Sequence, residues 1–228
     1  ANGSGKTTVL NILSGIVAPK EGYIRLEDKV VDKTSIRDST FMKGFHQRVG
    51  TVFQRADSQL FCPSVYEEIA FGPRQMGLSE EKVDQRVQDM AHVFGLEDLL
   101  EAVPYHLSGG QKKRVAMAAT LALNPDVLLL DEPMAALDPR TQTVLLGILH
   151  MLRQAGKTII LATHDLHRLQ ELVDRVILFD EAHHIVADDR PQVILQNVEL
   201  LQEVNLVDDS YHVHVHRHEG DEELHIHL

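Results

Sequence analysis

Three segments of the chain repeat apolar residues at the spacing of one helix face. The first begins at Val9 and ends before Pro19, the second follows a candidate cap at Ser79 and stops at Gly95, and the third begins at Pro139. The apolar faces of the second and third helices comprise Val83, Val87, Met90, Ala91, Phe94, Val144, Leu145, Ile148, Leu149 and Leu152. These segments are predicted to be amphipathic helices that cover an apolar layer.

Shorter apolar runs separate these helices and predict β-strands. The expected strands cover residues 48–53, 126–131, 157–163 and 175–180, and residues 22–32 are typical of a hairpin. Strands that alternate with helices favour a parallel α/β sheet, and the helical pattern near residues 60–123 indicates an inserted helical subdomain. The 43% of apolar residues can fill such a core.

The composition excludes several other classes of protein. Apolar runs stay well below the roughly 20 residues that span a bilayer, and no secretory signal is visible. Cys62 is the single cysteine, so an internal disulfide is impossible and a reducing compartment is favoured. A net charge of −12 argues against nucleic acid as the partner of the whole surface.

The first eight residues, ANGSGKTT, match the end of the phosphate-binding pattern G-x-x-x-x-G-K-[ST]. Its glycines let backbone N–H groups approach phosphate oxygens, its lysine reaches the β- and γ-phosphates, and its hydroxyl holds Mg²⁺. The candidate ATP-binding residues here are Asn2, Gly3, Ser4, Gly5, Lys6, Thr7 and Thr8. The first glycine of the pattern would precede Ala1, so we expect a fragment whose missing part includes that glycine and a strand. By itself the stretch could equally be an ordinary terminal loop.

Two acids end the apolar run VLLLDEP at 127–133. Asp131 at the end of a buried strand is placed to hold Mg²⁺, and Glu132 to polarise a water molecule for attack on the γ-phosphate. The alternative is an ordinary strand followed by an acidic turn. The candidate phosphate-binding segment at the start of the chain makes this alternative less favourable.

The segment LSGGQ at 107–111 is the most specific motif, because typical residue frequencies produce it by chance about once in several thousand chains of this length. Its serine and glycines open a helix, which makes a second phosphate site. With these motifs in order, the chain resembles the ATP-binding-cassette (ABC) ATPases from Ala1 to about Leu206. The resemblance implies a P-loop NTPase fold with a RecA-like parallel sheet core and a helical subdomain at about 60–123.

The resemblance also assigns roles to further residues. Gln54, expected to end a strand, matches the Q-loop glutamine that touches Mg²⁺ and the attacking water, and His164 matches the histidine that contacts the γ-phosphate. AALD at 135–138 matches the D-loop, although alanine replaces its usual serine. The residues expected to act on the ATP of a second cassette are Ser108, Gly109, Gly110 and Gln111.

The stretch RADSQLFCPSVYEEIAFGP at 55–73 is similar to the energy-coupling-factor branch, in which this segment meets helices of a membrane subunit. The resemblance implies the ATPase of a nickel or cobalt importer that lies on the cytoplasmic face of the membrane. It would work as a homo- or heterodimer with an integral membrane subunit, using ATP and Mg²⁺. A vitamin importer of the same branch, a soluble ABC ATPase without transport and a degenerate regulatory cassette remain alternatives, and the segment could also be filler of a helical core.

The tail 207–228 has no counterpart in the cassette, assigned to 1–206. Histidines alternate with aliphatic residues on either side of Gly220-Asp221, which predicts a hairpin with one histidine face. Closing it there sets His216 opposite His225 and His214 opposite His227, so four imidazoles could bind one ion such as Ni²⁺ or Co²⁺. A solvated low-complexity tail, or a strand paired elsewhere, is the alternative.

Overall fold

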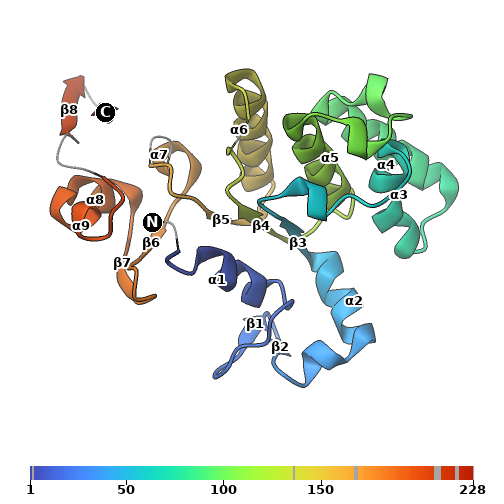
Figure 1. Ribbon diagram of the computed structural model, residues 1–228, viewed down its shortest axis with the longest axis horizontal. Coiled ribbons are helices and arrows are strands. Elements are labelled where there is room, and N and C mark those ends of the chain that lie inside the picture. The colour runs from blue at the N-terminus through green and yellow to red at the C-terminus, as the bar shows by residue number, and fades with distance from the viewer. Residues whose placement is uncertain (2, 136, 167–168, 208–211, 219–220, 228) are drawn as a thin grey trace. The chain divides into compact units, whose positions relative to one another are not determined.

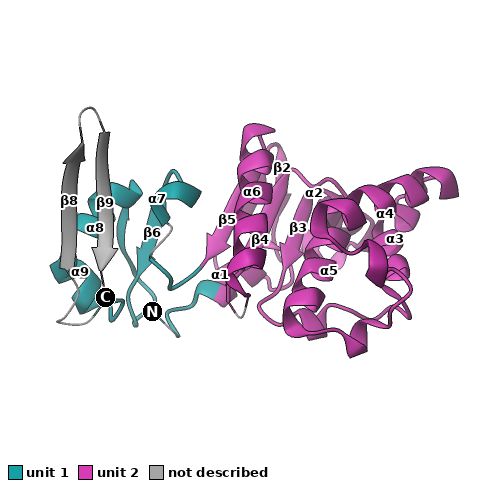
Figure 2. Ribbon diagram, turned by 90° about the horizontal axis from the view of Figure 1, so that it is seen from above, with its two compact units in different colours: residues 1–6, 163–228 teal, residues 7–162 magenta. Residues whose placement is uncertain are grey.

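A computed structural model describes residues 1, 3–135, 137–166, 169–207, 212–218 and 221–227, with backbone alone in the last two ranges. It divides into a larger unit of residues 7–162 and a smaller unit of residues 1–6 and 163–228 (Figure 2). Each unit has its own apolar core.

The larger unit is built on a parallel sheet in the order β3-β4-β5 (Figure 1). Its strands are β3 (Val49–Val52), β4 (Val127–Asp131) and β5 (Thr158–Ala162). The central strand β4 has neighbours on both edges and four buried side chains in succession, as expected for a parallel strand covered on both faces. Because successive side chains alternate, Leu129 packs in the cluster that contains Leu10.

Helices cover both faces of this sheet, with α6 on one side and α1 and α2 on the other (Figure 1). Their bounds are α1 (Lys6–Leu13), α2 (Ser39–Arg48) and α6 (Pro139–Gln154). The cluster between the sheet, α1, α2 and the hairpin consists of Leu10, Val31, Met42, Phe45, Val49, Leu129 and Ala162. The predicted face of α6 is wrong at Val144, which is exposed, because the buried stripe runs through Leu145, Ile148 and Leu149.

The predicted hairpin at 22–32 is confirmed as β1 (Ile24–Leu26) and β2 (Lys29–Val31), paired antiparallel. Helix α2 was not predicted. Its cap is visible in the sequence, since Asp38 accepts hydrogen bonds from the N–H groups of Thr40 and Phe41.

Three helices form the predicted helical subdomain, namely α3 (Val65–Gln75), α4 (Glu80–Phe94) and α5 (Gly109–Leu121). Val83, Val87, Ala91 and Phe94 bury one face of α4 as predicted, and Gly95 ends the helix at a φ of +60°. Ser79 occupies the N-cap position, but its side chain makes no capping hydrogen bond, so the predicted cap is correct only in position.

The smaller unit contains β6 (Val176–Phe179), β7 (Ile185–Asp189), α7 (Leu169–Leu172), α8 (Pro191–Gln196) and α9 (Val198–Glu203). The alternation of strands and helices placed the 175–180 strand in a parallel sheet, whereas β6 pairs antiparallel with β7. The cause is local, because Asp180 accepts the N–H of His184 and closes a turn after β6. The core of this unit comprises Leu166, Leu169, Leu178, Ile194, Leu195, Leu201 and Val204.

The histidine-rich tail forms a hairpin of β8 (His212–His218) and β9 (Asp221–His227), but the predicted register is wrong by two residues. His214 pairs with His225 and His212 with His227, since Asp221 already pairs with His218 and is not a turn residue. An even shift leaves the same residues on each face of the ribbon. In the described part of the chain, no helix is both long and apolar enough to cross a membrane.

Candidate active site

The carboxyl end of β4 carries the candidate metal-binding oxygens of the larger unit. The hydroxyl of Thr7, in the first turn of α1, donates a hydrogen bond of 2.7 Å to Oδ2 of Asp131, the last residue of β4. Asp131 is buried. A hydroxyl and a carboxylate at this separation suit Mg²⁺, which prefers oxygen ligands and takes few of them from the protein.

Glu132 follows at the point where the chain leaves the sheet. Its φ of +46° is uncommon for a residue with a side chain, and its carboxyl-bearing side chain is buried together with that of Asp131. The N–H of Glu132 donates to the carbonyl of Ala162 at 2.9 Å, which extends the pairing between β4 and β5 by one residue. Backbone pairing on one side and a sharp turn on the other therefore hold Glu132 in this conformation.

A buried lysine from α5 reaches the same turn. Nζ of Lys113 donates to the carbonyl oxygens of Glu132 and, at 3.4 Å, of Ala135. Burial lowers the pKa of Lys113, while the charges of Glu132 and Asp131 oppose that shift. Sequence reasoning missed this residue, although its helical spacing to buried Ala116, Met117 and Thr120 is visible.

The serine-glycine motif opens α5 as predicted. Ser108 is the N-cap and forms a capping box with Gln111, in which each side chain bonds the other residue's backbone N–H at 3.3 and 2.8 Å. Leu107 is buried and anchors the motif, whereas Ser108 and Gly109 are exposed. This capping box leaves out the N–H groups of Gly109 and Gly110, which lie at the helix N-terminus where an anion site would form.

Gln54 lies outside the strand that was predicted to end with it, because β3 stops at Val52. The side chain of Gln54 is exposed. The loop that contains Gln54 is held in place by Gln59. The amide of Gln59 accepts from the N–H of Phe53 and donates to the carbonyl of Thr51 and to Oγ1 of Thr120. Gln59 thus attaches the segment after Gln54 to both β3 and α5, a role that its surroundings in the sequence did not indicate.

In the D-loop, Asp138 caps α6 by accepting from the N–H groups of Arg140 and Thr141. The hydrogen bonds from Thr141 and Arg140 hold the pKa of Asp138 below its usual value.

The smaller unit carries most of the remaining candidate residues, and Thr8 belongs to the larger unit. Gly3 and Gly5 have φ values of +80° and +95°, which only glycine adopts freely and which a phosphate-binding turn needs. The carbonyl of Ala1 accepts from Nζ of Lys6 at 2.7 Å and from Oγ of Ser4 at 2.9 Å. His164 is exposed at the end of the segment that follows β5. Asn2 lies outside the described residues, and Thr8 is exposed on α1.

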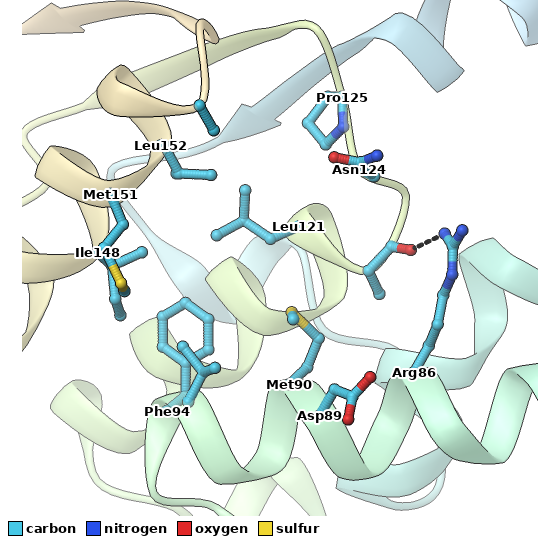
Figure 3. Close-up of a pocket in the computed structure, with 13 residues that line it drawn as sticks. Arg86, Asp89, Met90, Phe94, Leu121, Asn124, Pro125, Ile148, Met151 and Leu152 are labelled. Carbon is cyan, nitrogen blue, oxygen red and sulfur yellow. Dashed lines mark hydrogen bonds between the residues drawn. The ribbon is translucent and has the colours of Figure 1, made fainter.

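A pocket of about 450 Å³ lies elsewhere in the larger unit, between α4, residues 121–125 and α6 (Figure 3). Its lining is mainly apolar, and at one edge Arg86 extends from α4 to donate a hydrogen bond of 2.6 Å to the carbonyl of Ala122. None of the residues assigned above to ATP or Mg²⁺ lines it.

Comparison with known proteins identifies the family of the chain. A family model described as ABC transporter matches residues 1–135. The nickel import ATP-binding protein LarO of Lactiplantibacillus plantarum is 48% identical over 187 residues, which cover 82% of this chain and 78% of LarO. The energy-coupling factor transporter ATP-binding protein EcfA2 of Methanospirillum hungatei is 40% identical over 90% of this chain and 50% of its own length.

A solved structure gives the same result for the fold. CbiO1 of Clostridium perfringens, described as part of the ABC transporter complex cbiONQ, matches with a TM-score of 0.74 and 35% identity. The match covers 90% of this chain and 80% of that one. The predicted P-loop NTPase fold is therefore confirmed, and the chain belongs to the ABC transporter family as one of its ATP-hydrolysing cassettes.

Proposed function

We propose that this chain is the motor subunit of a membrane importer for nickel or cobalt ions. The observation that carries the ATPase part is the Thr7–Asp131 hydrogen bond, which joins the first turn of α1 to the acidic end of β4 beside Glu132. The similarity to LarO, a nickel import ATP-binding protein, supports the choice of substrate. The similarity to EcfA2 keeps other substrates of the energy-coupling-factor group as the alternative.

In this proposal the residues of the chain divide the work. Gly3, Ser4, Gly5 and Thr8 contribute N–H groups to the phosphates, and Lys6 exchanges its bond to the Ala1 carbonyl for the β- and γ-phosphate oxygens. Thr7 and Asp131 would hold Mg²⁺, with Gln54 assisting; the ion neutralises charge on the phosphates.

Two further side chains act at the γ-phosphate. Glu132 accepts a proton from the attacking water, and its buried position in a fixed turn keeps the carboxylate aimed at one point. His164 donates to a γ-phosphate oxygen.

A second cassette completes each site, and we take it to be a second copy of this chain. Ser108, Gly109, Gly110 and Gln111 open α5, and the capping box of Ser108 and Gln111 leaves out the N–H groups of Gly109 and Gly110. Two cassettes in head-to-tail contact would bring these groups to the ATP held by the partner, closing a symmetric dimer.

The segment 55–73 is proposed to meet the membrane subunit. Phe61 and Phe71 are 68% and 44% exposed, and their rings touch edge to face with centroids 5.0 Å apart. Two adjacent exposed aromatic rings are typical of a protein-binding surface. Glu68 is buried and accepts the N–H groups of Phe61 and Cys62, so the surface is held in place from below. The chain would then act at the cytoplasmic face of the membrane.

The histidine tail is proposed as a separate metal-binding element, with residues 1–206 as the ATPase domain. The pairs His212–His227 and His214–His225 occupy directly opposed register positions of β8 and β9. Imidazole suits nickel, cobalt, copper and zinc alike, so His212, His214, His225 and His227 do not select the ion by themselves. Titration of the full-length protein with Ni²⁺ tests this, and an affinity unchanged by His212→Ala with His214→Ala would contradict it.

Uptake of radioactive Ni²⁺ and Co²⁺ by cells that express the full-length protein with its membrane subunit tests the main proposal. Uptake should require ATP and fall to background with Glu132→Gln, while pull-down from detergent-solubilised membranes still recovers the membrane subunit. Uptake of another substrate with no response to either ion would select the alternative, and recovery of no membrane protein would indicate a soluble ABC ATPase.

A further inference from the structure

Lys113 is the basic residue that the described core buries, with 4% of its surface exposed. The other buried polar or charged residues in the described part of the chain are Ser4, Ser14, Glu68, Thr120, Asp131 and Glu132. A buried ammonium group is costly unless it is hydrogen-bonded and near opposite charge. The site described above provides both conditions.

The contacts of Lys113 converge on one turn. Its Nζ donates to the carbonyl of Glu132, which also accepts the N–H of Ala135 at 3.2 Å, and it lies 3.4 Å from the carbonyl of Ala135. The turn is held from its other side by Gln142 of α6, whose Nε2 donates to the carbonyls of Met134 and Leu137. Lys113 is thus the link between this turn and α5.

The N-cap of the same helix is Ser108, five residues before Lys113. The hydroxyl of Ser108 is engaged in the capping box. The backbone of Lys113 is part of α5, and its Nζ is bonded to the Glu132 carbonyl. Lys113 therefore couples the position of the serine-glycine motif to that of the turn that carries Glu132. Any rotation of α5 must either move the turn that carries Glu132 or break the hydrogen bonds of a buried cation.

We propose that Lys113 is a positioning residue for hydrolysis, which holds Glu132 in its left-handed conformation and ties it to the helix that contacts the partner's ATP. The inference rests on the proposed role of Glu132 as the base. Its consequence is that the buried carboxylate is aligned when α5 is seated and misaligned when α5 moves. Lys113 does not touch the nucleotide in this account, so its effect appears in turnover and not in ATP affinity.

The test uses Lys113→Met in the full-length protein, which keeps the length of the side chain and removes the ammonium group. Lys157→Met is the control, because Lys157 is partly buried and donates to a backbone carbonyl, that of Asn124 at 3.3 Å. It also lies 3.8 Å from Asp126, away from Asp131 and Glu132. Lys113→Met should lower kcat at least about tenfold and change KM for ATP less than about threefold, as expected for a group that acts only in the transition state. The control should change neither value.

A double-mutant cycle separates positioning from a general loss of structure. If Lys113 acts through Glu132, adding Lys113→Met to Glu132→Gln should lower the residual rate no further. Additive losses, an unchanged kcat in Lys113→Met, or an equal loss in Lys157→Met would overturn the inference. Lys113→Gln, which retains a donor, replaces the methionine variant in the same cycle if that variant does not fold. Full activity of Glu132→Gln alone would instead refute the assigned base.

Discussion

Thr7 and Asp131 are 124 residues apart in the chain, yet the threonine hydroxyl donates to the aspartate at 2.7 Å. The contact joins the first turn of α1 to the last residue of β4, two elements of the larger unit. Parallel strands followed by helices bring such ends to one edge of the sheet, where phosphate and metal sites of α/β folds lie.

Replacing Thr7 by valine should therefore weaken ATP binding in a Mg²⁺-dependent way. The shape of the side chain is retained and only the hydroxyl is lost, so affinity should fall at least about tenfold with Mg²⁺ and little in its absence. Isothermal titration of ATP with Mg²⁺ or with EDTA measures both values. Thr143→Val, an exposed site on α6, is the isosteric control, and an equal loss with and without the ion would contradict the metal role of Thr7.

Gly50 of β3 should be intolerant of any side chain. A Cβ built there lies 2.6 Å from Cγ2 of Thr120 and 2.9 Å from Cγ of Pro125, so Gly50→Ala forces β3 away from α5. We expect a loss of about 1–3 kcal/mol in the free energy of unfolding, as for overpacking of a core.

Gly147 provides the opposite control. It lies inside α6, where a Cβ would meet nothing within 4 Å, so Gly147→Ala should raise the stability by about 0.5–1 kcal/mol through helix propensity alone. Urea unfolding monitored by circular dichroism measures both variants. A neutral Gly50→Ala would show that β3 and α5 are packed less closely than described.

Cys62 should react slowly with alkylating reagents at neutral pH. Burial, and next the charge of nearby Glu68, raise the pKa of Cys62 to about 11, and thiolate is the reactive form. At pH 8 about one thiol in a thousand is then ionised, against roughly a quarter in the unfolded chain.

Iodoacetamide labelling followed by mass spectrometry tests this directly, because Cys62 is the single cysteine. The native rate should rise about tenfold for each pH unit up to pH 10, since deprotonation increases as pH approaches the raised pKa. The urea-unfolded protein, whose rate should level off near pH 9, is the reference. Equal native and unfolded rates at pH 8 would contradict the described environment.

The motifs with fixed spacing could be predicted from the sequence because local chemistry determines them. Pro139 opens α6, Gly95 ends α4 and Ser108 caps α5 as expected, since each depends on backbone geometry within a few residues. Assignments that depend on tertiary packing were less successful. The exposure of Val144 depends on how α6 packs, and the antiparallel partner of β6 depends on a turn at Asp180 that was not recognised in the sequence.

The candidate site shows the same division. Thr7, Asp131 and Ser108 were predicted from motifs and occupy the expected element ends. Gln59 and Lys113 were not predicted, because glutamine and lysine are usually exposed and no local pattern marks one that bonds a distant carbonyl. The hairpin of the tail was predicted but not its register, since moving the turn by one residue shifts the register by two and leaves the alternation unchanged.

The central claim is that one ATP is held by the phosphate loop of one chain and the serine-glycine turn of another. Complementation tests it most directly, by measuring ATP turnover in a mixture of Lys6→Ala and Ser108→Arg proteins that are each inactive alone. A mixed dimer would contain one site with both elements intact, so an equal mixture that exchanges subunits should recover about a quarter of wild-type turnover. A mixture as inactive as its separate components would contradict the account.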